Sequence, residues 1–138
     1  MVFLIKLVDK YVGNLVCNFL GLFSKKREID SPVSNILVVQ LWGIGETVLT
    51  LPSFEALRKR FPKARIDVLS TPRNKDVFFG NKSISNIVLV KLSPFSILNF
   101  VLKNIKKYDL VIDMEEYLNA SAIMSFFAGR NVVGYSHG

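Results

Sequence analysis

The sequence predicts an α/β fold, in which a parallel β-sheet carries helices on both faces and is preceded by an amphipathic helix. Two observations predict it. Short apolar runs rich in β-branched residues alternate with longer segments whose apolar residues stand three and four positions apart. The connections between these segments are short and contain glycine, proline, serine and asparagine. Such alternation favours a parallel sheet, because each helix returns the chain to the same direction across one face.

Composition limits the kind of protein this can be. The 138 residues are enough for one core of ordinary size and too few for two full domains. Cys17 is the single cysteine and can form no internal disulfide, which fits a reducing compartment. The formal net charge of +7 favours contact with anionic surfaces such as lipid head groups, sugar phosphates or nucleic acid. For any single basic cluster, a solvated helix face is the simpler explanation.

Residues 1–27 are expected to form an amphipathic helix, and residues 28–34 a linker. Three charged residues near the middle of the apolar stretch 1–23 argue against a membrane span. A narrow polar stripe, opposite a wide apolar face, is formed by Lys6, Lys10, Asn14, Asn18 and Gly21. Such a helix lies on a membrane, helped by the basic triplet 25–27, or packs on a partner or on its own protein. The sequence leaves these alternatives open.

The first half of the domain from residue 35 onward reads as strand, helix, strand and short helix. Residues 36–41, "ILVVQL", form a β-branched run typical of a strand buried on both faces. The next segment, 45–61, repeats apolar residues at helical spacing, with Pro52 in an early turn or at a kink. Residues 64–70 are the second predicted strand. Residues 73–81 are predicted to form a short helix closed by Gly80-Asn81.

The second half continues the same alternation. Residues 84–91 are the third predicted strand, and a helix over 93–108 begins with Ser93 as cap and Pro94 in its first turn. A strand at 109–114, a helix at 118–129 and a strand opening at 131–135 complete the Rossmann-like pattern. In such sheets ligands bind beyond the carboxyl ends of the strands. The connections that matter are therefore 42–47, 70–76, 91–95 and 114–120.

The turn "WGIGET" after the first strand raises the question of a bound nucleotide. Gly43 and Gly45 match the first two glycines of a dinucleotide fingerprint, but Val48 occupies the third position. A phosphate-binding P-loop would also need a lysine, which this turn lacks. The turn instead places Glu46 in the first turn of a helix, where the helix amino terminus stabilises a carboxylate by about 0.3–1 kcal/mol. Glu46 is then either an ordinary first-turn acid or a base that accepts a proton from a substrate hydroxyl.

The stretch from residue 35 to 138 resembles the amino-terminal domain of the family 9 glycosyltransferases, the heptosyltransferase-like enzymes. Three blocks carry the resemblance in the same order: "ILVVQLWGIGETVLTLPSFEALRKRFPKARIDVL", "YDLVIDMEEYLNASAIMSFFAG" and "NVVGY". The segment "VDKYVGNLVCNFLGLF" is also similar to a leader that some members carry.

The resemblance implies one half of a GT-B fold, in which two Rossmann-like domains face each other. Residues 35–138 correspond to the acceptor-side domain, incomplete, with the donor-binding domain absent. The implied reaction is an inverting, metal-independent transfer of heptose or a related sugar from a nucleotide-sugar, ADP-linked, to a lipopolysaccharide-type glycan. No cofactor or metal is expected, and the chain is expected to be inactive without a donor domain.

The resemblance also assigns site residues. Glu46 takes the position of the family's candidate base, which is usually an aspartate. The residues expected to bind the acceptor are Gly43, Gly45, Thr47, Arg73, Lys75, Lys91, Glu115, Asn119 and Ser121. Many members carry a basic residue at the position of Asn119. The three basic side chains near strand ends suit acceptor phosphates or carboxylates, and each is also explained as plain surface.

The expected partners follow from the same resemblance and from charge. They are an anionic glycan or glycolipid acceptor, a separate donor-domain chain, and the inner face of the cytoplasmic membrane for a cytoplasmic, peripheral protein. Nucleic acid is not expected, because the basic residues are dispersed and no stacking aromatics interleave with them. The alternative function is a non-catalytic module that binds glycolipid or acts as a scaffold at a membrane surface.

Overall fold

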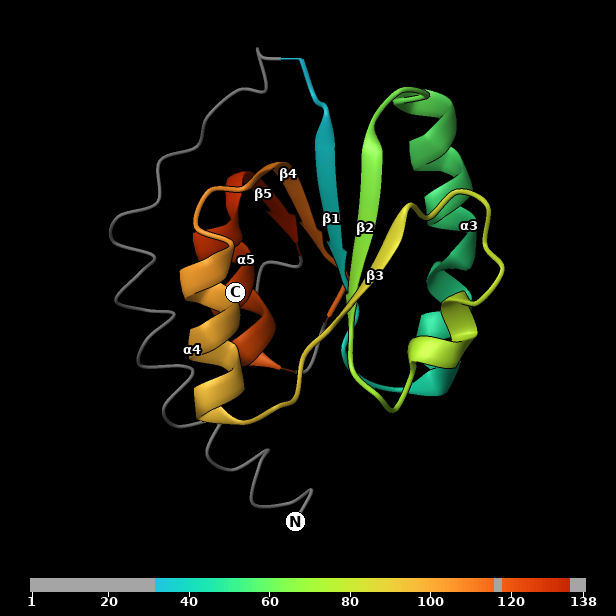
Figure 1. The fold of residues 1–138 in the computed structure, drawn as a ribbon. Coiled ribbons are helices and arrows are strands. Elements are labelled where there is room, and N and C mark those ends of the chain that lie inside the picture. The colour runs from blue at the N-terminus through green and yellow to red at the C-terminus, as the bar shows by residue number, and fades with distance from the viewer. Residues whose placement is uncertain (1–31, 116–117, 135–138) are drawn as a thin grey trace.

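A five-stranded parallel sheet forms the centre of the computed structural model, which describes residues 32–115 and 118–134 (Figure 1). The predicted helix 1–27 lies outside the described residues. The strands are β1 (Asn35–Val39), β2 (Arg65–Ser70), β3 (Asn86–Leu89), β4 (Tyr108–Asp113) and β5 (Gly129–Gly134). They are arranged in the order β3-β2-β1-β4-β5, and every neighbouring pair is parallel. The predicted α/β class is confirmed.

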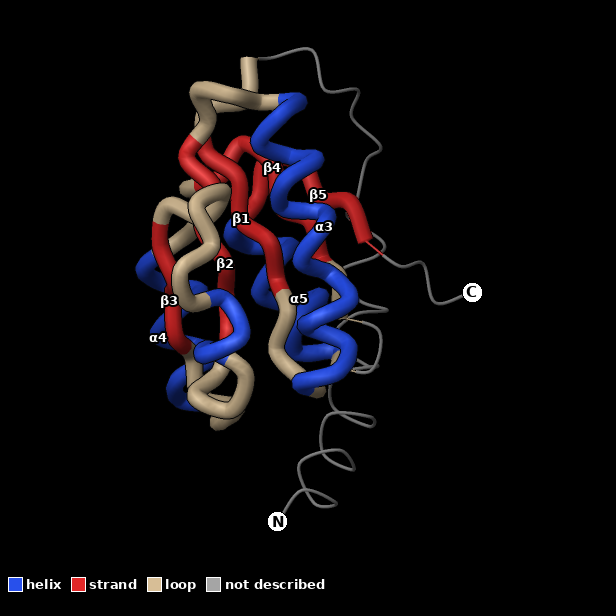
Figure 2. The backbone as a smooth tube through the Cα atoms, turned by 90° about the vertical axis from the view of Figure 1, so that its right-hand side faces the viewer, coloured by secondary structure: helices blue, strands red, loops and turns tan. Residues whose placement is uncertain are grey.

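The helices cover both faces of the sheet, as predicted. On one face lie α3 (Ile44–Arg60) and the short 3₁₀ helix η2 (Lys75–Phe78), and on the other lie α4 (Pro94–Lys103) and α5 (Asn119–Ala128) (Figures 1 and 2). The strand β1 is buried between the two layers, with Ile36 and Val38 in the α3 core and Leu37 and Val39 in the α4–α5 core. The alternation follows from the period of two in a strand.

The boundaries of several elements differ from the predictions. The helix predicted over 93–108 ends at Lys103, because the Asn104 side chain donates a hydrogen bond to the carbonyl of Phe100 and Lys106 adopts a φ of 51°. The chain reverses in this turn, so that Tyr108 begins β4 instead of ending a helix. Strand β3 is only four residues long, the predicted helix 73–81 is reduced to η2, and β5 begins at Gly129.

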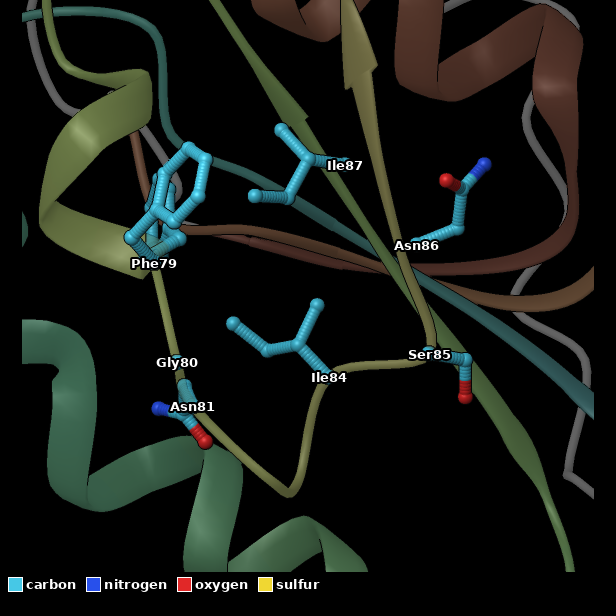
Figure 3. Close-up of a pocket in the computed structure, with 8 residues that line it drawn as sticks. Phe79, Gly80, Asn81, Ile84, Ser85, Asn86 and Ile87 are labelled. Carbon is cyan, nitrogen blue, oxygen red and sulfur yellow. The ribbon is translucent and has the colours of Figure 1, made fainter.

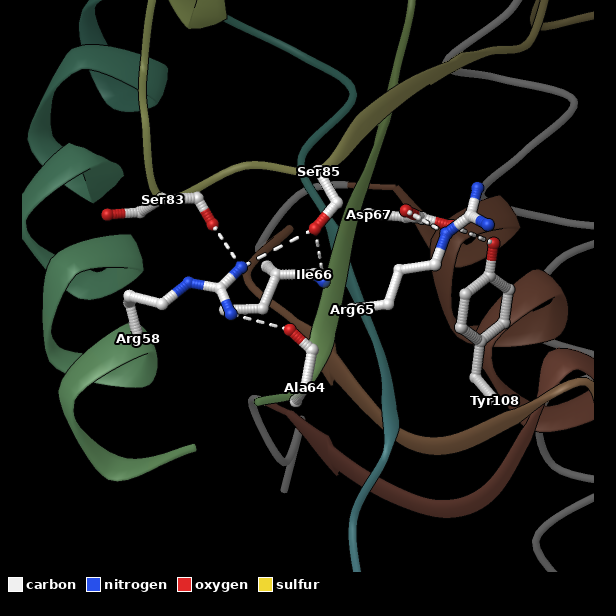
Figure 4. A network of polar contacts seen from close by, with 8 residues as sticks. All are labelled: Arg58, Ala64, Arg65, Ile66, Asp67, Ser83, Ser85 and Tyr108. Carbon is white, nitrogen blue, oxygen red and sulfur yellow. Dashed lines mark hydrogen bonds and ion pairs between the residues drawn. The ribbon is translucent and has the colours of Figure 1, made fainter. Parts of the chain in front are cut away.

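A buried polar network holds the amino-terminal edge of the sheet together (Figure 4). The carboxylate of Asp67, which is 1% exposed, accepts hydrogen bonds from the Tyr108 hydroxyl and from Nε of Arg65, both at 3.0 Å. On the other side of β2, the Arg58 guanidinium of α3 donates to the carbonyls of Ala64 and Ser83 at 2.6 and 3.0 Å. A buried charge is tolerated when it is paired in this way, so these residues serve the fold.

The Tyr108–Asp67 contact predicts a loss of stability at alkaline pH. Burial, and then the neighbouring carboxylate, raise the pKa of Tyr108 above its ordinary value. The folded state therefore keeps a neutral phenol at a pH where the unfolded state loses the proton. The contribution of Tyr108 to the free energy of unfolding is therefore fully present below about pH 10, and it decreases as the pH rises further.

Tyr108→Phe is expected to lower the free energy of unfolding by about 1 kcal/mol at neutral pH, because it removes the hydrogen bond to Asp67. The variant is also expected to lose less stability between neutral and alkaline pH, because it has no phenol to titrate. The measurement is urea unfolding of both proteins at about pH 8 and about pH 11. An equal drop in the free energy of unfolding for the two proteins would contradict the assignment.

Candidate functional site

The carboxyl ends of β1 and β4 form the place where this sheet is expected to bind a ligand. The two strands are neighbours, yet α3 follows β1 onto one face and α5 follows β4 onto the other. The helices that follow the two strands therefore lie on opposite faces of the sheet. In open parallel sheets the crevice at such a point is the usual ligand site.

Glu46 lies at this edge, in the first turn of α3. The helix begins after Gly43, whose φ of 75° favours glycine, and the Glu46 carboxylate lies over the side of Gly43 where a Cβ would stand. Residues 44–46 are exposed, and a Cβ at Gly45 would meet nothing within 4 Å. Among the described residues, Glu46 has no hydrogen-bond or ion-pair partner. The carboxylate is thus accessible from solvent at the predicted position.

A buried glutamate accepts hydrogen bonds from the backbone that leads into the glycine turn. Glu115 follows β4 and is 4% exposed, and its Oε2 accepts hydrogen bonds from the backbone N–H groups of Leu41 and Trp42 at 3.0 and 2.9 Å. Asp113 accepts hydrogen bonds from the Glu115 N–H and from the Ser121 hydroxyl of α5, at 3.0 and 2.9 Å. The two carboxylates thus join the end of β4 to the glycine turn and to the first turn of α5.

An asparagine joins the ends of β1 and β2 to the start of α3. The Asn74 amide donates to the Gln40 carbonyl at 2.9 Å and to the Thr47 hydroxyl at 3.0 Å. Its Oδ1 accepts from the Ser70 hydroxyl and from the Thr71 N–H at 2.7 and 3.1 Å. The Thr47 hydroxyl in turn donates to the Gly43 carbonyl at 2.5 Å. This network gives the glycine turn a rigid base.

The structure separates the predicted acceptor residues into two groups. Gly43, Gly45 and Glu46 lie at the surface of the turn. Thr47, Glu115 and Ser121 are buried, with internal hydrogen bonds to backbone or side-chain groups. Their direct contact with an acceptor stays a prediction. In the structure their side chains bond to the glycine turn and to the residue before α5.

The remaining predicted residues are more dispersed. Arg73 is exposed, and its guanidinium carbon lies 4.7 Å from the centre of the Trp42 ring, which brings a positive charge next to the glycine turn. Asn119 is the half-buried first residue of α5. Lys75 is half-buried in η2, and Lys91 follows β3, two strands away from β1. The structure therefore brings Arg73 close to the turn and leaves Lys91 at a distance.

Sequence reasoning missed Asn74, Asp113 and Trp42. The only local signal for Asn74 is an asparagine placed just before a short helix, which is typical of a cap. Its partners Gln40 and Thr47 stand 34 and 27 positions away in the sequence, so periodicity could not reveal them. Asp113 closes a buried strand and Trp42 precedes the first glycine, and both could have been singled out from the predicted strand ends.

A separate hollow lies at the opposite, amino-terminal end of β3 (Figure 3). It is lined by apolar and neutral polar residues, among them Phe79, Ile84, Ser85 and Ile87. No titratable side chain lines it, so it offers no acid or base for a reaction. Glu46, Asp113 and Glu115 lie instead at the carboxyl ends of β1 and β4.

The two glycines of the turn predict opposite effects of a methyl group. Gly43→Ala is expected to cost at least about 1 kcal/mol, because alanine disfavours a positive φ and its methyl group displaces the Glu46 carboxylate. Gly45→Ala is expected to be neutral or stabilising by a few tenths of a kcal/mol, because this helical position is open. Urea unfolding of the two variants measures the difference. Equal effects would show that the turn does not have the described conformation.

The described residues offer neither a metal site nor a membrane span. Residues 32–115 and 118–134 contain no cluster of three histidine, cysteine or acidic side chains arranged to hold a metal. Within the same residues, every helix is too short or too polar to cross a bilayer.

Comparison with known proteins identifies a structural relative. No protein-family model matches the chain, and no curated protein matches it. Among solved structures, the chain is similar to a glycosyl transferase family 9 protein from Veillonella parvula DSM 2008, with a TM-score of 0.62 and 22% sequence identity. The likeness covers 83% of this chain and 34% of that protein, so the chain spans about a third of its length. At this identity the likeness shows the fold, which confirms the expected Rossmann-like arrangement.

Proposed function

We propose that this chain is the acceptor-binding half of an inverting glycosyltransferase of the family 9 type. The observation that carries the proposal is the exposed carboxylate of Glu46 beyond the carboxyl end of β1, next to β4, with no hydrogen-bond or ion-pair partner among the described residues. The fold shared with the Veillonella glycosyl transferase supports a glycosyltransferase-type module. The choice of heptose, an ADP-linked donor and a lipopolysaccharide-type acceptor comes from the sequence resemblance.

The proposed role of Glu46 is that of a general base. Its carboxylate accepts the proton of the acceptor hydroxyl while the hydroxyl oxygen forms a bond to the anomeric carbon of the donor sugar. The bond from that carbon to the nucleoside diphosphate breaks on the opposite side, and the nucleotide leaves with the bonding electron pair. The configuration at the anomeric carbon is therefore inverted. A donor domain must bind the departing nucleotide.

The charges near the turn support an anionic acceptor. Arg73 is exposed, and no carboxylate of the described residues pairs with it; its contact with Trp42 holds it beside the turn. A guanidinium in this position can form two parallel hydrogen bonds to a phosphate or carboxylate. The net charge of +7 favours the same class of acceptor and a location at the inner face of the membrane.

A transfer assay tests the proposal. The chain, reassembled with a donor domain, is given an ADP-linked sugar and a lipopolysaccharide core oligosaccharide, and NMR reads the anomeric configuration of the product. Product with inverted configuration is expected. Hydrolysis of the donor without transfer, or a product with retained configuration, would contradict the proposed reaction.

A further inference from the structure

Helix α4 exposes an apolar stripe on the side that faces away from the sheet. Phe95, Leu98 and Leu102 stand at helical positions i, i+3 and i+7, and Ile105 continues the row in the turn that follows the helix. Their exposed fractions are 82%, 55%, 64% and 57%. We call these four residues the α4 stripe.

The opposite side of α4 is already packed in the core. Phe100 and Val101 are buried there, and Ile97 is partly buried against the same cluster. The helix thus carries a second apolar face on the side opposite the core, and an apolar face of a helix is normally covered. Apolar residues that stand in a row at the surface, unlike single ones, mark a contact surface. The α4 stripe is therefore expected to have an occupant.

We propose that the occupant is the amino-terminal segment of this chain, residues 1–23. The spacing of its polar residues predicts a helix with a wide apolar face, which needs an apolar surface to cover it. The α4 stripe offers such a surface within the same molecule. This contact is independent of any reaction at Glu46.

The course of the chain places this segment within reach. The N–H groups of Ser34 and Asn35 both donate to Oδ2 of Asp109, at 2.9 and 3.0 Å, and Asp109 follows α4 by one short turn. The chain thus enters the domain at the edge where α4 ends. The eight residues 24–31 can span up to about 29 Å when extended, whereas α4 is about 15 Å long. A tether of this length keeps the two apolar surfaces at a high effective concentration.

Cysteine crosslinking tests the contact with the intact chain. Cys17 is the single native cysteine, and helical spacing places it next to Asn14 and Asn18, at the polar side of the segment. A second cysteine is introduced by Asn99→Cys, at an exposed position of α4 that leaves the stripe intact. The matched control is Ala56→Cys, exposed on α3 across the sheet (Figure 1). A short bis-maleimide reagent then joins thiols that lie close together.

The Asn99→Cys variant is expected to give about tenfold more intramolecular crosslink than the Ala56→Cys variant, at a yield that does not change with protein concentration. Adding Leu98→Ser and Leu102→Ser to Asn99→Cys is expected to lower the yield to that of the control. Both leucines are exposed, so the domain should still fold, which urea unfolding verifies.

Three results would overturn the proposal. Equal yields at positions 99 and 56 would show that the segment does not prefer α4. A crosslink that forms only between two molecules would assign the stripe to a second copy of the chain. Loss of the intramolecular crosslink when anionic phospholipid vesicles are added, together with co-sedimentation of the protein, would make the membrane the occupant.

Discussion

Replacement of Glu46 by glutamine is expected to lower the kcat of sugar transfer by about 100-fold or more, with little change in the KM for the acceptor. Glutamine has nearly the shape of glutamate but cannot accept the proton of the acceptor hydroxyl. Because Glu46 is exposed and has no described partner, the substitution should leave the fold unchanged. The measurement is steady-state transfer by the chain reassembled with a donor domain.

The same helix supplies a matched control. Glu55 is another exposed glutamate of α3, paired with Lys59 at 3.3 Å and remote from the glycine turn. Glu55→Gln is expected to leave kcat unchanged. Glu46→Asp retains a carboxylate and is expected to keep more activity than Glu46→Gln. If Glu46→Gln turned over as fast as the unmodified protein, Glu46 would not be the base.

Removal of the Glu115 side chain is expected to be the most destabilising single change at the site. Glu115→Ala removes the carboxylate that accepts from the buried N–H of Leu41 and the part-buried N–H of Trp42, and we expect a loss of about 3 kcal/mol in the free energy of unfolding. The glycine turn loses its support in the same step. Urea unfolding measures the cost, and transfer by the folded variant measures the effect on the turn.

Asp109 provides the control for Glu115, because it makes the equivalent contact at the other end of β1. Its carboxylate accepts from two consecutive N–H groups, those of Ser34 and Asn35, but water can replace it there because Ser34 is exposed. Asp109→Ala is expected to cost about 1 kcal/mol or less and to leave transfer unchanged. If the two variants lost the same free energy of unfolding, the burial of Glu115 would not be the reason for its effect on stability.

The arrangement of strands and helices could be predicted from the sequence because its signals are local. The run of residues 36–39 is apolar at every position, and in the structure this strand is buried on both faces. The end of α4 could not be predicted. The apolar spacing continues past Lys103. The helix nevertheless ends there, because the Asn104 side chain bonds to the Phe100 carbonyl and Lys106 adopts a positive φ.

The same distinction applies to the candidate site. The position of Glu46 was predictable, since a strand, a glycine turn and a helix follow one another directly in the sequence. The residues that support the turn could not be predicted, because Asn74 and Glu115 follow β2 and β4 and are distant from the turn in the sequence. Glu115 is expected from the sequence to bind the acceptor, and in the structure it is buried and accepts from the N–H groups of Leu41 and Trp42. The sequence does not show burial at single polar positions, so it could not predict these contacts.

An NMR titration of the ¹⁵N-labelled chain with a lipopolysaccharide core oligosaccharide tests most directly whether the acceptor binds at the glycine turn, next to Glu46. The amide signals of Gly45, Glu46, Arg73 and Asn119 are expected to shift with saturation at millimolar concentration or below. Shifts confined to the hollow around Phe79, or the absence of any shift at residues 43–47, would contradict binding at the turn.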